Sequence, residues 1–256
     1  MNLEKHLRAR RDGGAKLLVP YMTGGLGASW LEVVQALASA GADAIEIGIP
    51  FSDPVMDGPT VQEASQRALD DGATPAKIIA DTAQLDTEVP LAVMTYYNPV
   101  HHAGHARFAA SLADAGIDGA IVPDLPVDEL DGWGDAADAA GVETVLLATP
   151  TTTDERLRTI CERSRGFVYG VSLLGVTGER DRLADQAEAT GRRLKAATDR
   201  PVLLGVGISN AEQAVQAAAV ADGVVVGSAV VGRILRGGGA DEVHDFVRSL
   251  REALDT

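Results

Sequence analysis

Eight short apolar runs of strand length punctuate the chain. They begin near residues 17, 44, 90, 119, 144, 166, 201 and 223 and read LLVPYM, AIEIGI, PLAVMTY, GAIVPD, TVLLAT, GFVYGVS, PVLLGVG and GVVVGS. Runs of this length, bounded by turn residues, predict buried strands. In the second run Ile45, Ile47 and Ile49 share one parity, so Glu46 is predicted to point away from them.

The segments between these runs carry apolar residues at helical spacing. SWLEVVQALASAG (29–41) and TVQEASQRALDDG (60–72) each end at a glycine, the residue most often found just past a helix. ERLRTICERS, EQAVQAAAVADG and DEVHDFVRSLREAL show the same spacing, and MNLEKHLRARRDGG at the N-terminus indicates a short amphipathic helix.

Alternation of strands and helices is typical of a parallel sheet. Eight units in 256 residues favour an α/β fold closed as a (β/α)8 TIM barrel, with residues 1–256 forming a single domain behind the short N-terminal helix. The competing fold is a doubly wound open sheet, since MTGGLGAS follows the first strand. That loop lacks the G-x-G-x-x-G spacing, and no acid closes a second strand at the ribose-binding position, so the barrel is favoured.

Composition and charge narrow the classes of partner. The net charge of −15 repels phosphate backbones, which argues against nucleic acid. No apolar stretch reaches membrane-spanning length, and the charged N-terminus lacks the apolar core of a signal peptide. Cys161 is the only cysteine, so no internal disulfide can form. These features predict a cytoplasmic protein.

In a barrel of this type the active site lies at the C-terminal ends of the strands. Polar residues at those ends are Tyr21, Glu46, Asp53, Asp57, Tyr96, Asn98, Asp124, Tyr169, Ser172, Ser209 and Ser228. Glu46 stands out, because a carboxylate pointing into the barrel is desolvated and its pKa should rise, which suits a general acid/base. The alternative is a structural glutamate hydrogen-bonded to a neighbouring strand.

The acids that follow Glu46 have ordinary structural explanations. Asp57 precedes Gly58–Pro59 and could form a turn or cap the helix that starts near Thr60, and Asp53 precedes Pro54. On local sequence alone, both aspartates fit a structural role better than a catalytic one. Asp124, in PDLP, is a rival third acid.

Glycines gather at the ends of the last strands. GVGIS carries Gly207, and GSAVV places Gly227 and Ser228 directly before a helix. Backbone N–H groups at such a helix start can approach an anion closely where no Cβ intervenes. Their joint placement after the seventh and eighth strands predicts a phosphate site.

The stretch HHAGH, residues 101–105, invites a metal interpretation because imidazole is a good zinc ligand. It contains no H-E-x-x-H pattern and follows YYNP, which reads as a loop. A solvated loop is therefore expected there, and no metal site is predicted.

Several of these stretches together resemble the tryptophan synthase α subunit family. AIEIGIPFSDPVMDGPTVQ is similar to the family signature around the second strand and its loop, GVTGER to the mobile loop six, and GVGIS and GSAVV to the phosphate site. The resemblance covers nearly the whole chain. It implies retro-aldol cleavage of indole-3-glycerol phosphate to indole and glyceraldehyde 3-phosphate. It implies no cofactor in this chain and an α2β2 complex with a β subunit that carries pyridoxal phosphate (PLP) and receives the indole.

The resemblance also implies roles for individual residues. Glu46 matches the catalytic glutamate and Asp57 the catalytic aspartate, so both acids are expected to act on the substrate. The substrate-binding positions that match are Tyr21 and Tyr169 for the indole pocket, Thr177 for closure of loop six, and Gly178, Gly207, Gly227 and Ser228 for the phosphate. The positions that match the face toward the β subunit are Asp53, Pro54 and Asn98.

Some positions depart from the expected pattern. TGGLG replaces a Gly-Asp-Pro turn, Val206 stands where some members have Phe, and Leu173–Leu174 replaces a more polar pair. These changes bear on pocket shape and loop behaviour. The alternatives kept open are a stand-alone indole-releasing lyase, a sugar-phosphate isomerase on the same fold, and a regulatory subunit that only docks. An assay for indole, with and without a β subunit, separates them.

Overall fold

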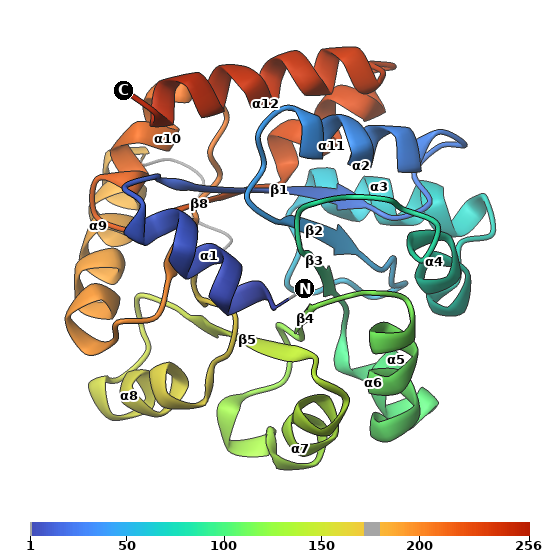
Figure 1. Ribbon diagram of the computed structural model, residues 1–256, viewed down its shortest axis with the longest axis horizontal. Helices are drawn as coiled ribbons and strands as arrows, with labels where there is room; N and C mark the ends of the chain where they lie inside the picture. Colours follow the sequence, from blue (N-terminus) through green and yellow to red (C-terminus); the bar gives the residue numbers. More distant parts are fainter. Residues whose placement is uncertain (1, 172–179) are drawn as a thin grey trace.

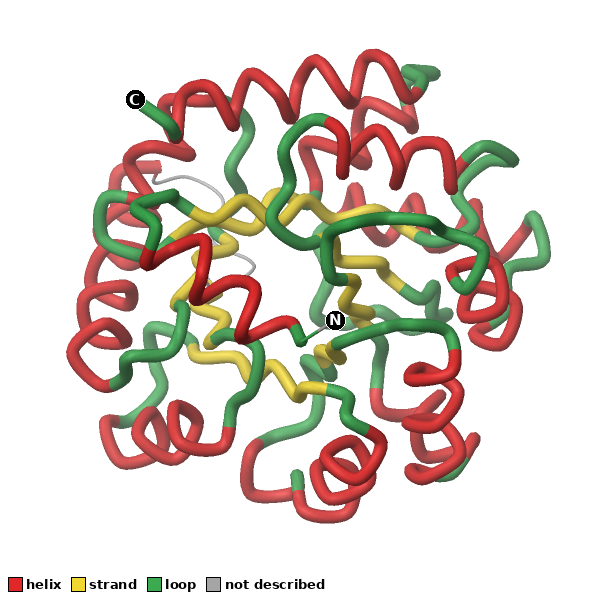
Figure 2. The backbone as a smooth tube through the Cα atoms, in the orientation of Figure 1, coloured by secondary structure: helices red, strands yellow, loops and turns green. Residues whose placement is uncertain are grey.

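The computed structural model describes residues 2–171 and 180–256, without the side chains of residues 180–186. Its strands form a closed, parallel barrel in sequence order, with the last strand pairing the first. Figure 2 shows this ring of strands surrounded by helices. The strands are β1 (Leu17–Thr23), β2 (Ile45–Gly48), β3 (Leu91–Met94), β4 (Gly119–Ile121), β5 (Glu143–Ala148), β6 (Val168–Val171), β7 (Val202–Gly205) and β8 (Gly223–Val226).

The predicted (β/α)8 barrel is therefore confirmed, and the open-sheet alternative is excluded. The helices of the described chain pack outside the ring, apart from the first, which crosses one end of it (Figure 1). They are α1 (Leu3–Asp12), α2 (Trp30–Ser39), α3 (Pro59–Asp70), α4 (Pro75–Thr82), α5 (Tyr97–Ala103), α6 (His105–Asp114), η1 (Val127–Glu129), α7 (Asp131–Ala140), α8 (Asp154–Arg163), α9 (Arg180–Ala197), α10 (Ala211–Ala218), α11 (Ser228–Leu235) and α12 (Ala240–Leu254). Among the described helices, none is both long enough and apolar enough to cross a membrane.

Strand alternation divides the apolar side chains into two cores. One parity of each strand packs against the surrounding helices, as Ile45 and Ile47 of β2 do. The other parity fills the barrel interior, where Ala44, Phe167 and Leu203 meet Leu3 and Leu7 of α1. Glu46 shares the parity of Ala44, so the chain directs its side chain into the barrel, as the alternation predicts.

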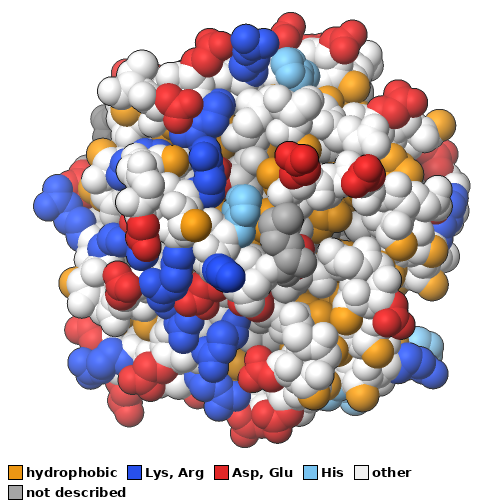
Figure 3. Space-filling model, viewed as in Figure 1, with side chains coloured by type: hydrophobic (Ala, Val, Ile, Leu, Met, Phe, Trp, Pro, Cys, Tyr) orange, Lys and Arg blue, Asp and Glu red, His pale blue; other side chains and the backbone are white. Residues whose placement is uncertain are grey.

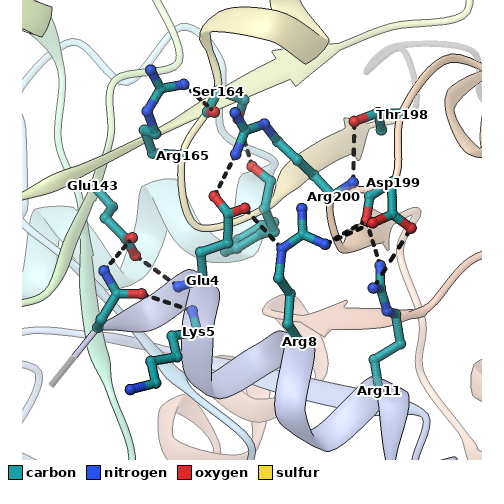
Figure 4. Close-up of polar contacts among 12 residues, drawn as sticks. Glu4, Lys5, Arg8, Arg11, Glu143, Ser164, Arg165, Thr198, Asp199 and Arg200 are labelled. Carbon is teal, nitrogen blue, oxygen red and sulfur yellow. Dashed lines mark hydrogen bonds and ion pairs between the residues drawn. The ribbon is translucent and has the colours of Figure 1, made fainter.

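The N-terminal end of the barrel is closed by α1 and held by ion pairs. Glu4 accepts hydrogen bonds from Arg8 Nε at 2.9 Å and from Arg200 Nη1 at 2.6 Å, and Arg8 Nη1 also reaches Asp199 at 2.9 Å (Figure 4). Lys and Arg side chains gather around α1 on this face, with acids among them (Figure 3). Because α1 plugs this end, the opening lies at the C-terminal ends of the strands.

In four of the strands a backbone N–H donates a hydrogen bond to a side chain that precedes the next strand along the ring. The acceptor is a carboxylate or a hydroxyl, and the donor lies at the first or second residue of β1, β3 and β7 and at the fourth residue of β5. The bonds run from Leu18 N to Asp43 Oδ2 (2.8 Å), Leu91 N to Asp118 Oδ2 (3.2 Å), Leu146 N to Ser164 Oγ (3.1 Å) and Val202 N to Asp222 Oδ2 (2.8 Å). This pattern recurs at β1, β3, β5 and β7, and it fixes neighbouring strands to one another below the site.

Candidate active site

Glu46 lies on β2 inside the barrel, and its side chain is 1% exposed. The strand ladders pair it with Tyr21 on one side and Ala92 on the other. Burial, reinforced by the charge of Asp57, raises the pKa of Glu46 to about 8. At neutral pH the carboxyl group is therefore protonated, and it can donate a proton and then take one back.

Asp57 lies in the loop that joins β2 to α3, and it is half-buried. Its Oδ2 atom accepts a hydrogen bond from the Tyr96 hydroxyl at 3.2 Å. Burial raises the pKa of Asp57 to about 6, and the bond from Tyr96 opposes that rise. The residue that caps α3 is Gly58, without a side-chain bond, so Asp57 does not act as the helix cap that its sequence position suggested.

Tyr21 on β1 and Tyr169 on β6 both lie close enough to Glu46 for its charge to act on their hydroxyl groups. Burial raises the pKa of both phenols, and the charge of Glu46 raises it further. Each ring lies over a glycine of the next strand. A Cβ on Gly205 would lie 2.5 Å from the Tyr169 ring, and one on Gly48 would overlap the Tyr21 hydroxyl. The two glycines thus leave room for large aromatic side chains beside Glu46.

Gly207, Gly227 and Ser228 lie where the seventh and eighth strands end. Gly227 is the N-cap of α11 and makes no side-chain capping bond, and Ser228, the first residue of the helix, is exposed. Gly207 has φ +74°, a conformation that favours glycine. The atoms nearest to a Cβ on Gly227 would be those of the Tyr21 side chain, at 3.6 Å or more. The helix start therefore lies beside the indole-pocket candidate Tyr21.

Thr177 and Gly178, the two remaining substrate-binding candidates, lie outside the described residues. Ser172 of the initial set does too.

The candidate docking residues lie on the surface around the same opening. Asp53 is exposed and accepts a hydrogen bond from Ser52 Oγ at 2.6 Å, and Pro54 next to it is half-buried. Val55 and Met56 follow, 78% and 39% exposed. Asn98 is exposed in the first turn of α5.

The third acid and the histidine stretch have structural roles. Asp124 Oδ1 accepts a hydrogen bond from Tyr97 N at 2.8 Å, and so satisfies an amide at the start of α5. The loop expected at HHAGH is wrong, because His101 and His102 are in α5 and His105 begins α6. His105 Nε2 lies 2.9 Å from the Tyr97 hydroxyl. Within the described residues, no group of three or more His, Cys, Asp or Glu side chains could hold a metal ion.

One residue of the site received no role from the sequence. Tyr96 met the strand-end criterion, but its contacts are with residues about 40 positions earlier, Met56 and Asp57. No local spacing reports such a contact. The only signal was its position just past the third strand, at the C-terminal end of a predicted barrel.

Comparisons with known proteins place this architecture in a family. The sequence model described as "Tryptophan synthase alpha chain" matches residues 7–253. The chain is 43% identical over 258 residues to the tryptophan synthase alpha chain of Thermobifida fusca, covering 97% of this chain and 96% of that protein. It is 47% identical over 225 residues to the alpha chain of Methanosarcina mazei, covering 87% and 82% respectively.

Solved structures give the same result. The tryptophan synthase alpha chain from Legionella pneumophila subsp. pneumophila matches with a TM-score of 0.90 at 33% identity, covering 100% of this chain and 98% of that chain. A chain of Mycobacterium tuberculosis tryptophan synthase matches with a TM-score of 0.91 at 36% identity, covering 99% and 98%.

Proposed function

Because this chain belongs to the tryptophan synthase alpha chain family, we propose that it cleaves indole-3-glycerol phosphate by a retro-aldol reaction to indole and glyceraldehyde 3-phosphate. The family makes the protein a lyase of tryptophan biosynthesis. The observation that carries the proposed mechanism is a pair of carboxyl groups at one opening, with the pKa of Glu46 raised to about 8 and that of Asp57 to about 6. Titratable groups whose pKa values are pushed apart can take opposite acid/base roles at one pH.

Glu46 exchanges the protons. In its protonated form it donates a proton to the indole ring carbon that carries the glycerol phosphate side chain. The resulting carboxylate then accepts the proton of the hydroxyl group beside that bond. The carbon–carbon bond breaks with its electrons returning to the indole ring, the hydroxyl-bearing carbon becomes the aldehyde, and Glu46 ends as it began.

Asp57 stabilises the charge that this protonation creates. Proton transfer to the ring leaves positive charge on the indole nitrogen, and an ionised carboxylate that accepts the N–H hydrogen bond offsets it. With a pKa of about 6, Asp57 is mainly ionised at neutral pH. We expect kcat/KM to fall below about pH 6, where Asp57 is protonated, and above about pH 8, where Glu46 is ionised.

The remaining candidate residues would hold the two ends of the substrate. Tyr21 and Tyr169 both lie near Glu46 and suit a flat aromatic ring. Backbone N–H groups at Gly227 and Ser228, at the start of α11, suit the phosphate, because the helix dipole favours an anion there. Gly207 and, from the family resemblance, Thr177 and Gly178 complete this set.

We also propose a β-subunit partner, in an α2β2 complex, with PLP held by the partner and no cofactor in this chain. Structures of Mycobacterium tuberculosis tryptophan synthase are among the close matches, which supports a complex. Exposed Val55 and Met56, beside Asp53 and Pro54, offer an apolar contact that a partner would cover. We propose further that residues 1–256 act as one domain and that the protein is cytoplasmic, in keeping with its lone cysteine.

The test is indole release by Glu46→Gln and Asp57→Asn. Glutamine has nearly the shape of glutamate but cannot exchange a proton, and asparagine has nearly the shape of aspartate but carries no charge. We therefore expect activity to fall by about 10²–10⁴-fold for Glu46→Gln. Glu143→Gln is the matched control, because Glu143 starts β5 at the opposite end of the barrel and also has a pKa raised by burial. Near wild-type indole release by Glu46→Gln would show that Glu46 is structural.

A further inference from the structure

Tyr96 connects three parts of the active-site opening. It lies two residues after the end of β3, is the N-cap residue of α5 and is 3% exposed. Its ring stacks on Phe51 of the β2–α3 loop, with ring centroids 5.0 Å apart and planes 23° apart. Its hydroxyl accepts a hydrogen bond from Met56 N at 2.9 Å and donates one to Asp57 Oδ2 at 3.2 Å.

From this geometry we propose that Tyr96 is a positioning residue, which fixes both the direction and the ionised state of the Asp57 carboxylate. The inference rests on the proposed function of Asp57 as the group that accepts the indole N–H. Tyr96 does not itself react in this scheme. It acts through Asp57, by holding the loop backbone and the carboxylate with the same hydroxyl group.

The polarity of the two hydrogen bonds is fixed by chemistry. A backbone N–H can only donate, so the Tyr96 oxygen must accept from Met56. The Tyr96 hydroxyl therefore donates its single proton to Asp57 Oδ2. This hydrogen bond is strongest when the Asp57 carboxylate is ionised. The bond therefore lowers the pKa of Asp57 against the effect of burial, which raises it.

The ring and the hydroxyl contribute separately. Stacking on Phe51 sets the height of the loop over the barrel, whereas the hydroxyl sets the orientation of Asp57 within it. Tyr96→Phe keeps the ring and removes the hydroxyl alone. The variant leaves Met56 N without its acceptor and Asp57 without its donor.

The experiment compares the wild type with Tyr96→Phe in steady-state indole production across pH. We expect kcat to fall about 10- to 100-fold, because a hydrogen bond to the charged group is lost, with little change in KM. The acid limb of kcat/KM should move to higher pH, since Asp57 loses the bond that favours its ionised form. The amide of Met56 should exchange its hydrogen faster with solvent.

Tyr97→Phe is the matched control. The adjacent hydroxyl is bonded to His105 and not to the loop, so its removal should leave the acid limb and the Met56 amide unchanged. A thermal melt of each variant establishes that the barrel is intact.

The outcomes separate this inference from the proposed function. If Asp57→Asn loses activity while Tyr96→Phe keeps the wild-type acid limb and Met56 exchange, the positioning role is overturned and the function stands. If Asp57→Asn keeps its activity, the role of Asp57 fails and the inference falls with it. A loss of activity in Tyr96→Phe without a shift of the acid limb also overturns the inference.

Discussion

The two carboxyl groups of the candidate site differ because their surroundings differ. Glu46 is enclosed by the barrel, no hydrogen-bond partner reaches its Oε2 atom among the described residues, and its pKa rises to about 8. Asp57 receives a hydrogen bond from Tyr96, and its pKa rises only to about 6. Ionising a buried carboxyl group destabilises the folded state. The same burial keeps Glu46 protonated at neutral pH, so that it can act as the acid.

This destabilisation should be measurable in the free energy of unfolding and in its dependence on pH. The pKa of Glu46 is higher in the folded chain than the ordinary value of 4.5, so the folded state binds the proton more tightly than the unfolded state. Stability from this group is fully present below about pH 4.5 and is lost as pH rises toward about 8. Glu46→Gln removes the dependence. We expect the variant to gain stability over the wild type as pH rises, by a few kcal/mol at pH 9.

Urea unfolding at pH 5, 7 and 9 measures this difference, and the wild type at pH 5 is the internal reference. Other groups titrate equally in both proteins, so the difference between them isolates Glu46. If the difference in free energy of unfolding between the two proteins stays constant from pH 5 to pH 9, the folded state does not hold the Glu46 carboxyl group in its protonated form.

At the scale of elements, sequence reasoning succeeded where the signal was local. Each apolar run became a strand, because buried parallel strands are short and apolar on both faces. It failed for α5, which contains Pro99 and whose first amide is satisfied by Asp124, 27 residues away. That helix depends on a tertiary contact. The hydrogen bond between Tyr96 and Asp57 could not be predicted from the sequence either, because it also joins residues far apart along the chain.

The start of α11 carries the phosphate prediction. Gly227→Val should weaken binding of inorganic phosphate or glyceraldehyde 3-phosphate markedly, because the new side chain occupies the approach to the backbone N–H groups. The protein fold should tolerate it, since a Cβ there meets Tyr21 only at ordinary contact distance. Calorimetric titration measures the binding, and circular dichroism checks the fold.

Gly239→Val is the matched control for this variant. Gly239 is also a helix N-cap, with φ −103° against −102° at Gly227, and a Cβ there would meet nothing within 4 Å. Its replacement should leave phosphate binding unchanged. Equal binding by wild type and a folded Gly227→Val would place the phosphate elsewhere.

Over the whole molecule, the two ends of the barrel have different tasks. The N-terminal end is plugged by α1 and tied down by the Glu4, Arg8 and Arg200 contacts. The C-terminal end carries the acids, and its loop exposes Val55 and Met56, two of the three large apolar side chains exposed in the described chain. The contacts that hold the fold and the candidate catalytic groups thus lie at opposite ends of the barrel, and the end that carries the acids is the one at which we propose that the partner binds.

The same short loop carries Asp57 near its end and the docking candidates Asp53 and Pro54 near its middle. A backbone hydrogen bond from Asp57 N to Pro54 O, 3.0 Å long, joins the two. A partner that moves Asp53 should therefore move Asp57, and a displacement of about 1 Å can change a rate on the order of 10²-fold. We expect the isolated chain to be a poor lyase that a β subunit strongly activates, and Asp53→Ala to lose more of that activation than of its isolated activity. Steady-state indole production, measured alone and during titration with β subunit, tests this against Asp86→Ala, an exposed loop acid on the α4–β3 side of the barrel. If Asp53→Ala and Asp86→Ala are activated equally, Asp53 does not couple docking to chemistry. High activity of the unassisted wild type would instead identify a stand-alone lyase.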